Sequence, residues 1–176
     1  AMWLILQDPH GDPEKEAEKY TDPEKEVPDP ETALAGARDI LAEMVSDDAD
    51  VRKCLREMMT REGILVTRAA KEEDSVYSMY YDYSEPVRTM APHRILAVNR
   101  GEREEFLKVT LEAPGEKAEA MVKNSCVRGD SPASRQVAEA CADAWERLIF
   151  PSLEREIRNE LTDRANVSAI RVFSQN

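Results

Sequence analysis

Apolar residues recur along most of the chain with the 3.6-residue period of an α-helix. Asp29 and Pro30 are typical of a helix start, and the residues after them put four apolar side chains on one face: Leu34, Ala37, Leu41 and Met44. Ser46 or Asp47 can open a second helix with a similar face, which Gly63 can end: Val51, Leu55, Met58 and Met59. Two such helices joined by two or three residues predict an αα-hairpin or part of a helix-turn-helix.

The same period returns in the second half of the chain. Ser131 and Pro132 predict another helix start, followed by an apolar stripe of Val137, Cys141, Trp145 and Leu148. Pro151 should kink or restart this helix, after which the apolar face continues through Leu153, Ile157, Leu161, Ala169, Ile170 and Phe173. Because both flanks of the first stripe are polar, we expect the Trp145 indole to be buried.

One segment alternates with the two-residue period of a strand. Leu107, Val109 and Leu111 are separated by polar residues, which predicts a strand over 106–111. The chain is therefore predicted to be mainly α: a multi-helix bundle with helix-turn-helix-like hairpins and one small β element.

Aromatic residues gather before a predicted break in the middle of the chain. Tyr77, Tyr80 and Tyr81 are spaced for one face of a helix, which either stacks on bases or packs into a core. Residues 84–86, Ser-Glu-Pro, are predicted to end this segment. The next helix is expected from His93 to Arg100, with Gly101 placed to end it.

Negative charge is concentrated at the amino-terminal end. The whole chain has 36 acidic and 24 basic side chains, a net charge of −12, and its first 30 residues carry nine acids, three lysines and five of the ten prolines. Asp-Pro-Glu-Lys-Glu occurs at 12–16 and again at 22–26, which predicts two short helical turns capped by Asp. We divide the chain into an acidic Pro-rich extension, 1–29, and a helical domain, 30–176. The extension is either an interaction arm or a solvated peripheral segment.

Composition limits the classes of partner and compartment. A protein that binds phosphate backbones needs an excess of Lys and Arg on one face, so the acidic balance argues against nucleic acid as a direct partner of this chain. The three cysteines are odd in number and far apart, which fits a reduced cytosol and predicts a cytoplasmic protein. The longest apolar run, Met2 to Leu6, is too short for a membrane span or the core of a signal peptide. No membrane partner is expected.

The histidine, cysteine and carboxylate side chains form no catalytic or metal-binding pattern in the sequence. His10 and His93 have no His, Cys or paired carboxylate at helical spacing, so no metal and no cofactor is predicted. The sequence also lacks a phosphate-binding loop, a dinucleotide-binding glycine motif and a nucleophile elbow. We therefore predict no catalytic residue and no enzyme activity.

The clearest charged cluster lies at the end of the helix expected from His93. Arg94, Arg100 and Arg103 complement the negative end of that helix, or they contact a carboxylate or phosphate of a neighbouring domain or a nucleic acid. Three acids interrupt them and bring the local net charge close to zero: Glu102, Glu104 and Glu105. We interpret these arginines as a candidate interdomain or nucleic-acid contact, with interdomain docking favoured.

Several longer strings are familiar in combination. They comprise residues 12–20 (DPEKEAEKY), 33–43 (ALAGARDILAE), 81–86 (YDYSEP), 92–102 (PHRILAVNRGE), 151–165 (PSLEREIRNELTDRA) and 169–173 (AIRVF). Together they resemble the Tex family of bacterial transcription accessory proteins. The resemblance implies part of the N-terminal helical region of a longer chain, ending before a ribonuclease-H-like domain. A helix that still runs at the last residues agrees with that expectation.

The resemblance also implies a nucleic-acid-binding factor in transcription whose binding is carried chiefly by a C-terminal RNA-binding domain outside this segment. The implied partners are the remaining domains of the parent chain, RNA or DNA through the whole protein, and the transcription machinery. Two functions stay open: a non-catalytic scaffold, or a stand-alone helix-turn-helix module that binds nucleic acid. The module would use the basic residues of the hairpin, which mix with acids: Arg52, Lys53, Arg56 and Arg61.

Overall fold

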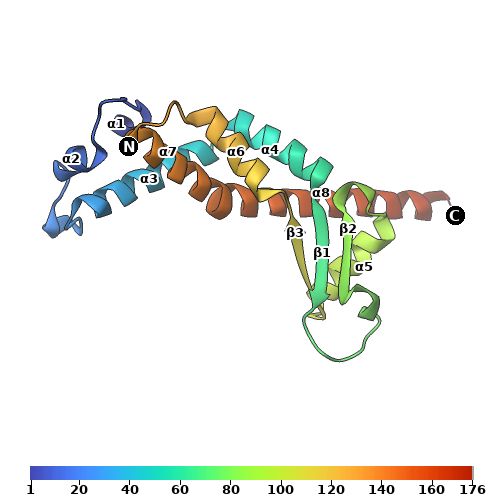
Figure 1. The fold of residues 1–176 in the computed structure, drawn as a ribbon. Helices are drawn as coiled ribbons and strands as arrows, with labels where there is room; N and C mark the ends of the chain where they lie inside the picture. Colours follow the sequence, from blue (N-terminus) through green and yellow to red (C-terminus); the bar gives the residue numbers. More distant parts are fainter. Residues whose placement is uncertain (176) are drawn as a thin grey trace. The chain divides into compact units, whose positions relative to one another are not determined.

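The computed structural model describes residues 1–175 and is mainly α with one small sheet, which confirms the predicted fold class (Figure 1). Internal contacts divide the chain into two compact units. The helical unit comprises Ala1–Cys54 and Gly115–Pro151, and the sheet unit comprises Leu55–Pro114 and the chain from Ser152 on. Helices α4, Ala49–Glu62, and α8, Phe150–Gln175, each continue from one unit into the other. The boundary expected near residue 29 stays a prediction.

The helical unit begins with short elements whose starts follow the predicted capping pattern. After α1, Met2–Ile5, helix α2 spans Pro13–Glu18 and a 3₁₀ turn, η1, spans Pro23–Lys25. The Asp12 carboxylate accepts the N–H groups of Glu14 and Lys15, and Asp22 accepts that of Glu24. Both acidic turns predicted from the repeated string are therefore confirmed.

Helix α3, Pro30–Ser46, begins at the predicted cap, where the Asp29 carboxylate accepts the N–H and the hydroxyl of Thr32. Its buried side differs in part from the predicted stripe. Leu34 and Leu41 are buried, whereas Ala37 is half-buried and Met44 is exposed. The cap of α4 is also one residue later than predicted, because Asp48 accepts the N–H groups of Asp50 and Val51.

Two further helices complete the helical unit: α6, Gly115–Cys126, and α7, Pro132–Asp143, which packs beside both α3 and α6. Ser131 caps α7 through the Ser134 N–H, as predicted. Trp145 is only 5% exposed, and its ring centroid lies 5.4 Å from that of Phe150. A π-helical segment, η4, spans Ala144–Ile149 just before Pro151, which lacks the N–H that a regular turn needs. The predicted burial of Trp145 is confirmed.

The sheet unit contains three antiparallel strands in the order β2-β1-β3: β1, Ile64–Ala69; β2, Asp82–Pro86; and β3, Leu107–Glu112. The strand predicted near 106–111 is confirmed, but two strands were missed. Strand β1 follows α4 directly after Gly63, so its short apolar run reads as the end of a helix. Strand β2 was missed because it is rich in polar residues.

The prediction of a helical tyrosine face was wrong. Residues Ser78–Tyr80 form a single 3₁₀ turn, η2, and the predicted break at 84–86 lies inside β2. The Thr67 hydroxyl on β1 donates to the Tyr80 carbonyl at 2.6 Å, so a residue distant in the sequence fixes this turn. Tyr77 and Tyr80 are buried, which agrees with the core-packing alternative.

Helix α5, Pro92–Arg103, follows a 3₁₀ turn, η3, Val87–Thr89, and continues past Gly101, where the sequence predicted its end. The reversal occurs instead at Glu105, which has a φ of 64°. Gly101 is needed for packing, because a Cβ there would lie 2.5 Å from Leu107 Cδ1. The missing side chain thus lets α5 pack closely against β3.

The apolar face of α8 is confirmed only in its first part. Leu153, Ile157 and Leu161 are buried in the sheet unit, whereas Ile170 is 64% exposed and Phe173 is 85% exposed. The apolar period of α8 thus continues after Leu161, but the last apolar side chains of the helix are exposed.

Candidate functional site

Arg94, one of the three predicted contact arginines, is held by an ion pair inside the sheet unit. Its Nε donates to Glu85 Oε2 at 2.9 Å and its Nη2 to Oε1 at 2.6 Å. The Tyr83 hydroxyl donates to the same carboxylate at 2.7 Å. Burial by itself raises the pKa of Glu85, but the bonds from Arg94 and Tyr83 and the charge of Arg94 outweigh it and lower the pKa overall. Arg94 therefore joins α5 to β2.

The structure does not bring the three arginines into one site. Arg103 follows Arg94 by nine positions, which is two and a half helical turns and puts the two residues on opposite sides of α5. Arg100 and Arg103 are exposed and share a side. Beside them the Tyr77 hydroxyl donates to Glu104 Oε2 at 2.8 Å, and burial together with this bond raises the pKa of Tyr77.

Arg103 lines a polar cleft of about 430 Å³ between α5 and α8 within the sheet unit. Arg158 Nη2 donates to Glu102 Oε1 at 2.8 Å and to Asn99 Oδ1 at 3.1 Å. Asn99 in turn donates to the Thr162 hydroxyl at 2.9 Å. The wall of the cleft is thus an internally bonded polar network that the sequence reading missed, because its members come from two helices about 60 residues apart.

Three of the four basic residues of the predicted helix-turn-helix are also engaged by their own chain: Arg52, Arg56 and Arg61. Arg56 Nη2 lies 2.7 Å from Glu160 Oε2, and Arg56 Nη1 lies 3.3 Å from Glu156 Oε2. Arg52 Nη1 donates to the Ser46 carbonyl at 3.1 Å. Arg61 Nη2 lies 3.8 Å from Oε2 of the neighbouring Glu62. These contacts use side chains that a DNA-reading helix needs for bases and phosphates.

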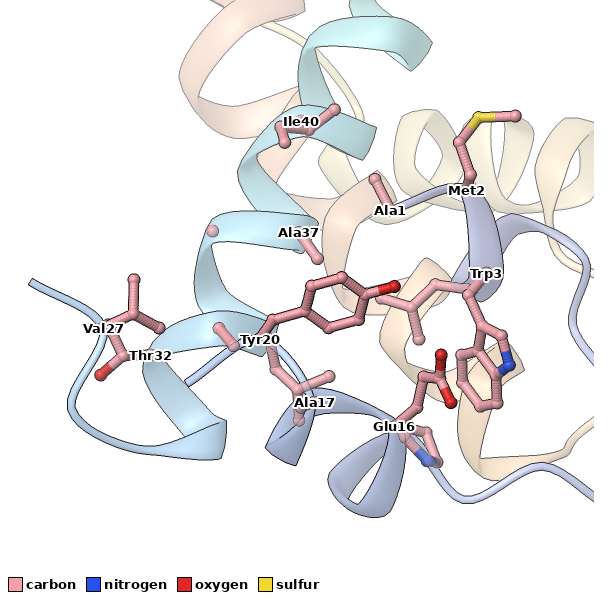
Figure 2. Close-up of a pocket in the computed structure, with 15 residues that line it drawn as sticks. Ala1, Met2, Trp3, Glu16, Ala17, Tyr20, Val27, Thr32, Ala37 and Ile40 are labelled. Carbon is pink, nitrogen blue, oxygen red and sulfur yellow. The ribbon is translucent and has the colours of Figure 1, made fainter. Parts of the chain in front are cut away.

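A different feature, an apolar groove of about 570 Å³, lies in the helical unit (Figure 2). Helices α1 and α2 and the first half of α3 form it, with Tyr20 and Val27 from the connecting segments. The Tyr20 side chain extends toward Trp3, while Ala37 and Ile40 lie on successive turns of α3. Among the residues that line the groove, Glu16 is the one charged side chain, and it pairs with Lys19 at 2.6 Å. The groove is suited to an apolar ligand or partner, and offers no acid–base pair.

Comparison with known proteins identifies the family. Residues 8–173 match the family described as Tex central region-like. The chain belongs to this family.

Similar proteins occur in several bacteria and in human. The Bacillus subtilis protein YdcI, described as uncharacterized, is 41% identical over 91% of this chain and 23% of its own length. The Neisseria gonorrhoeae transcriptional accessory protein Tex is 31% identical over 98% of this chain and 24% of its own length. The human S1 RNA-binding domain-containing protein 1 is 27% identical over 80% of this chain and 16% of its own length. The chain spans about a quarter of the length of the bacterial relatives.

Within the described part of this Tex chain, residues 1–175, no group of three His, Cys, Asp or Glu side chains is arranged to hold a metal ion. No helix among the same residues is long and apolar enough to cross a membrane. The buried side-chain nitrogen and oxygen atoms of these residues all have hydrogen-bond partners.

Two cysteines of the Tex chain form a local pair that the spacing of the sequence did not predict. The Cys141 thiol, buried on α7, donates a hydrogen bond to Cys126 at the end of α6. This bond lowers the pKa of Cys126, the Ser125 hydroxyl lowers it further, and burial acts in the opposite direction. Helix packing creates the pair, so no sequence motif could have shown it.

Proposed function

We propose that this chain is a non-catalytic helical scaffold segment of a Tex-type transcription accessory protein, and that the whole protein, rather than this segment, binds nucleic acid. The names of two relatives support the proposal, since one is a transcriptional accessory protein and the other contains an S1 RNA-binding domain. The proposed partners are the remaining domains of the parent chain, RNA or DNA through the whole protein, and the transcription machinery. The proposed compartment is the cytoplasm.

The observation that carries the scaffold proposal is the pairing of arginines with carboxylates of the same chain. In the sheet unit Arg94 pairs with Glu85, Arg56 with Glu160 and Arg158 with Glu102, each at 2.6 to 2.8 Å. A carboxylate that already neutralises a guanidinium weakens the attraction of that guanidinium for a phosphate. The net charge of −12 further disfavours approach of a polyanion. These arginines support packing more than recognition.

Arg100 and Arg103 are proposed to contact another domain of the parent protein. Both are exposed in the last turn of α5, and no described carboxylate lies within ion-pair distance of either guanidinium. Since acids surround them in the sequence, a single fixed carboxylate suits them better than a long nucleic-acid strand.

A salt-dependent titration tests the scaffold proposal against a stand-alone helix-turn-helix module. Labelled single-stranded RNA, single-stranded DNA and duplex DNA are titrated with the 176-residue chain and with the whole protein, at about 50 and about 200 mM salt. We expect binding by the whole protein and almost none by the chain. Tight binding by the chain, with affinity falling steeply as salt rises, would show that the segment is itself a nucleic-acid module.

A further inference from the structure

The apolar groove of the helical unit has an exposed extension along α3. Ala33, Gly36, Ala37, Ile40 and Met44 recur at helical spacing on one side of this helix, next to the side that is buried inside the unit. Ile40 is 52% exposed, and at the rim Tyr20 is 64% and Met2 is 73% exposed. A Cβ placed on Gly36 would meet nothing within 4 Å. The described part of the chain therefore leaves a continuous apolar strip uncovered.

The shape of this strip favours a helix as its occupant. The strip from Ala33 to Met44 covers twelve residues of helix and is about 16 Å long, which matches about three turns of a second helix. Small residues at Ala33, Gly36 and Ala37 leave room for the side chains of such a helix to approach closely. The sheet lies in the other unit, so the described helical unit offers no strand edge to which an extended peptide could add its backbone hydrogen bonds.

Charge around the strip selects among amphipathic helices. Asp39 and Glu43 are exposed on α3, on the flank of the strip away from the buried side, and Asp39 also lies 3.7 Å from the Arg147 guanidinium of the same unit. Residues 1–30, which supply the other walls of the groove, carry nine acids against three lysines. A second copy of this chain would bring the same acids face to face and is disfavoured. A partner whose apolar face is flanked by Lys and Arg would be attracted.

We propose that this groove docks an amphipathic helix, apolar on one face and flanked by Lys and Arg, from a separate protein. The apolar side chains of that helix fill the space between Trp3, Tyr20 and Ile40, and its cations face Glu43. The contact joins a partner to the Tex segment without using the arginines of the sheet unit. It goes beyond the scaffold role, because it gives the segment a binding partner of its own.

A synthetic peptide tests the proposal. The probe is a labelled 18-residue helix of Leu and Ala with Lys along both flanks, compared with a peptide carrying Glu in place of Lys and with a scrambled sequence. We expect only the first peptide to bind the 176-residue chain in fluorescence anisotropy, with affinity that falls as salt rises. Equal binding of the Lys and Glu peptides, or equal binding of the scrambled one, overturns the proposal.

Variants locate the binding. Ile40→Asp adds a negative charge, which by itself should attract the Lys peptide, so a loss of about tenfold or more would show that the apolar contact decides affinity. Met2→Asp should act in the same direction, and Glu43→Lys should weaken binding through charge. Val167→Asp, a matched change at an exposed apolar position of α8, should leave it unchanged. All four positions are exposed, and circular dichroism checks that the helices remain. Unchanged affinity in both Ile40→Asp and Met2→Asp overturns the site.

Two measurements identify the source of the occupant. The whole protein should bind the Lys peptide as tightly as the 176-residue chain. If the chain binds and the whole protein does not, a segment of the same protein fills the groove and the separate-partner assignment is wrong. Light scattering should show a monomer, and a dimer abolished by Ile40→Asp would assign the groove to a second copy instead.

Discussion

Glu85 on β2 and Arg94 on α5 form a bidentate ion pair with N–O distances of 2.9 and 2.6 Å. The carboxylate side chain is 12% exposed and the guanidinium side chain is 30% exposed. A candidate docking arginine thus has a structural contact within the sheet unit. The pairing follows from the strand register, which places Glu85 opposite Leu65 on β1.

Replacing the carboxylate tests how much this pair stabilises the sheet unit. Glu85→Gln keeps the shape but loses charge-assisted bonds, so we expect a loss of about 1.5–3 kcal/mol in the free energy of unfolding at neutral pH, measured with urea. Asp82→Asn is the matched control, because the Arg68–Asp82 pair is largely exposed and should contribute little.

The same pair predicts a pH dependence. Because the pKa of Glu85 is lower in the folded chain than its ordinary value, the pair contributes fully above that ordinary value, and its contribution is lost as pH falls through the folded pKa. The stability difference between the parent chain and Glu85→Gln should therefore shrink on acidification. A difference that stays constant down to strongly acidic pH would contradict an ionised pair.

Truncating Trp145 tests the core of the helical unit. Trp145→Ala removes a buried indole that packs against Phe150, and we expect a loss of about 3–5 kcal/mol, seen as a lower urea midpoint. Truncation of the exposed Tyr20, Tyr20→Ala, is the control and should change stability far less. Equal midpoints for the parent chain and Trp145→Ala would show that the indole does not support this core.

Two glycines in helices should respond to alanine in opposite directions. Gly101→Ala forces a Cβ against Leu107 and Tyr77, and overpacking of this kind costs about 1–3 kcal/mol. Gly36→Ala meets open space on α3, so the higher helix propensity of Ala should stabilise the chain by about 0.5–1 kcal/mol. Thermal unfolding of both variants measures the contrast, and a neutral Gly101→Ala would contradict the close approach of α5 to Leu107.

Charge reversal of Arg100 tests the proposed interdomain contact. Arg100→Glu should disturb the stability or domain arrangement of the whole Tex-type protein, measured by calorimetry and small-angle scattering, while RNA affinity stays within a few-fold of the parent. A drop in affinity of about tenfold or more with the fold intact would place Arg100 at nucleic acid instead.

The cysteine pair predicts a reactivity that depends on Cys141. Since the hydrogen bond from Cys141 lowers the pKa of Cys126, alkylation of Cys126 should reach its maximum rate at a lower pH in the parent chain than in Cys141→Ala. Peptide mass spectrometry measures the rate, and the exposed Cys54 serves as an internal control whose profile should not respond to the substitution. Identical Cys126 profiles in the two chains would contradict the bond.

The sequence by itself determined the local elements, because their causes lie within a few residues. Asp12, Asp22, Asp29 and Ser131 cap the turns and helices that follow them, and a Pro after each fixes the first position. The burial of Trp145 and the strand near Leu107 were also predictable, since each repeats its apolar period over several residues. The strings that resemble Tex identified the family for the same reason: they are read in order along the chain.

Only the tertiary structure decided which side chains meet. Strands β1 and β2 exist because they pair with each other and β1 with β3, and the polar sequence of β2 gives no sign of this. Gly101 looked like a helix end, but its missing side chain makes room for Leu107. The groove beside Ile40 arises where α1, α2 and α3 come together, and the polar cleft where α5 meets α8. A period along one element specifies a face, whereas a site requires the contacts between elements.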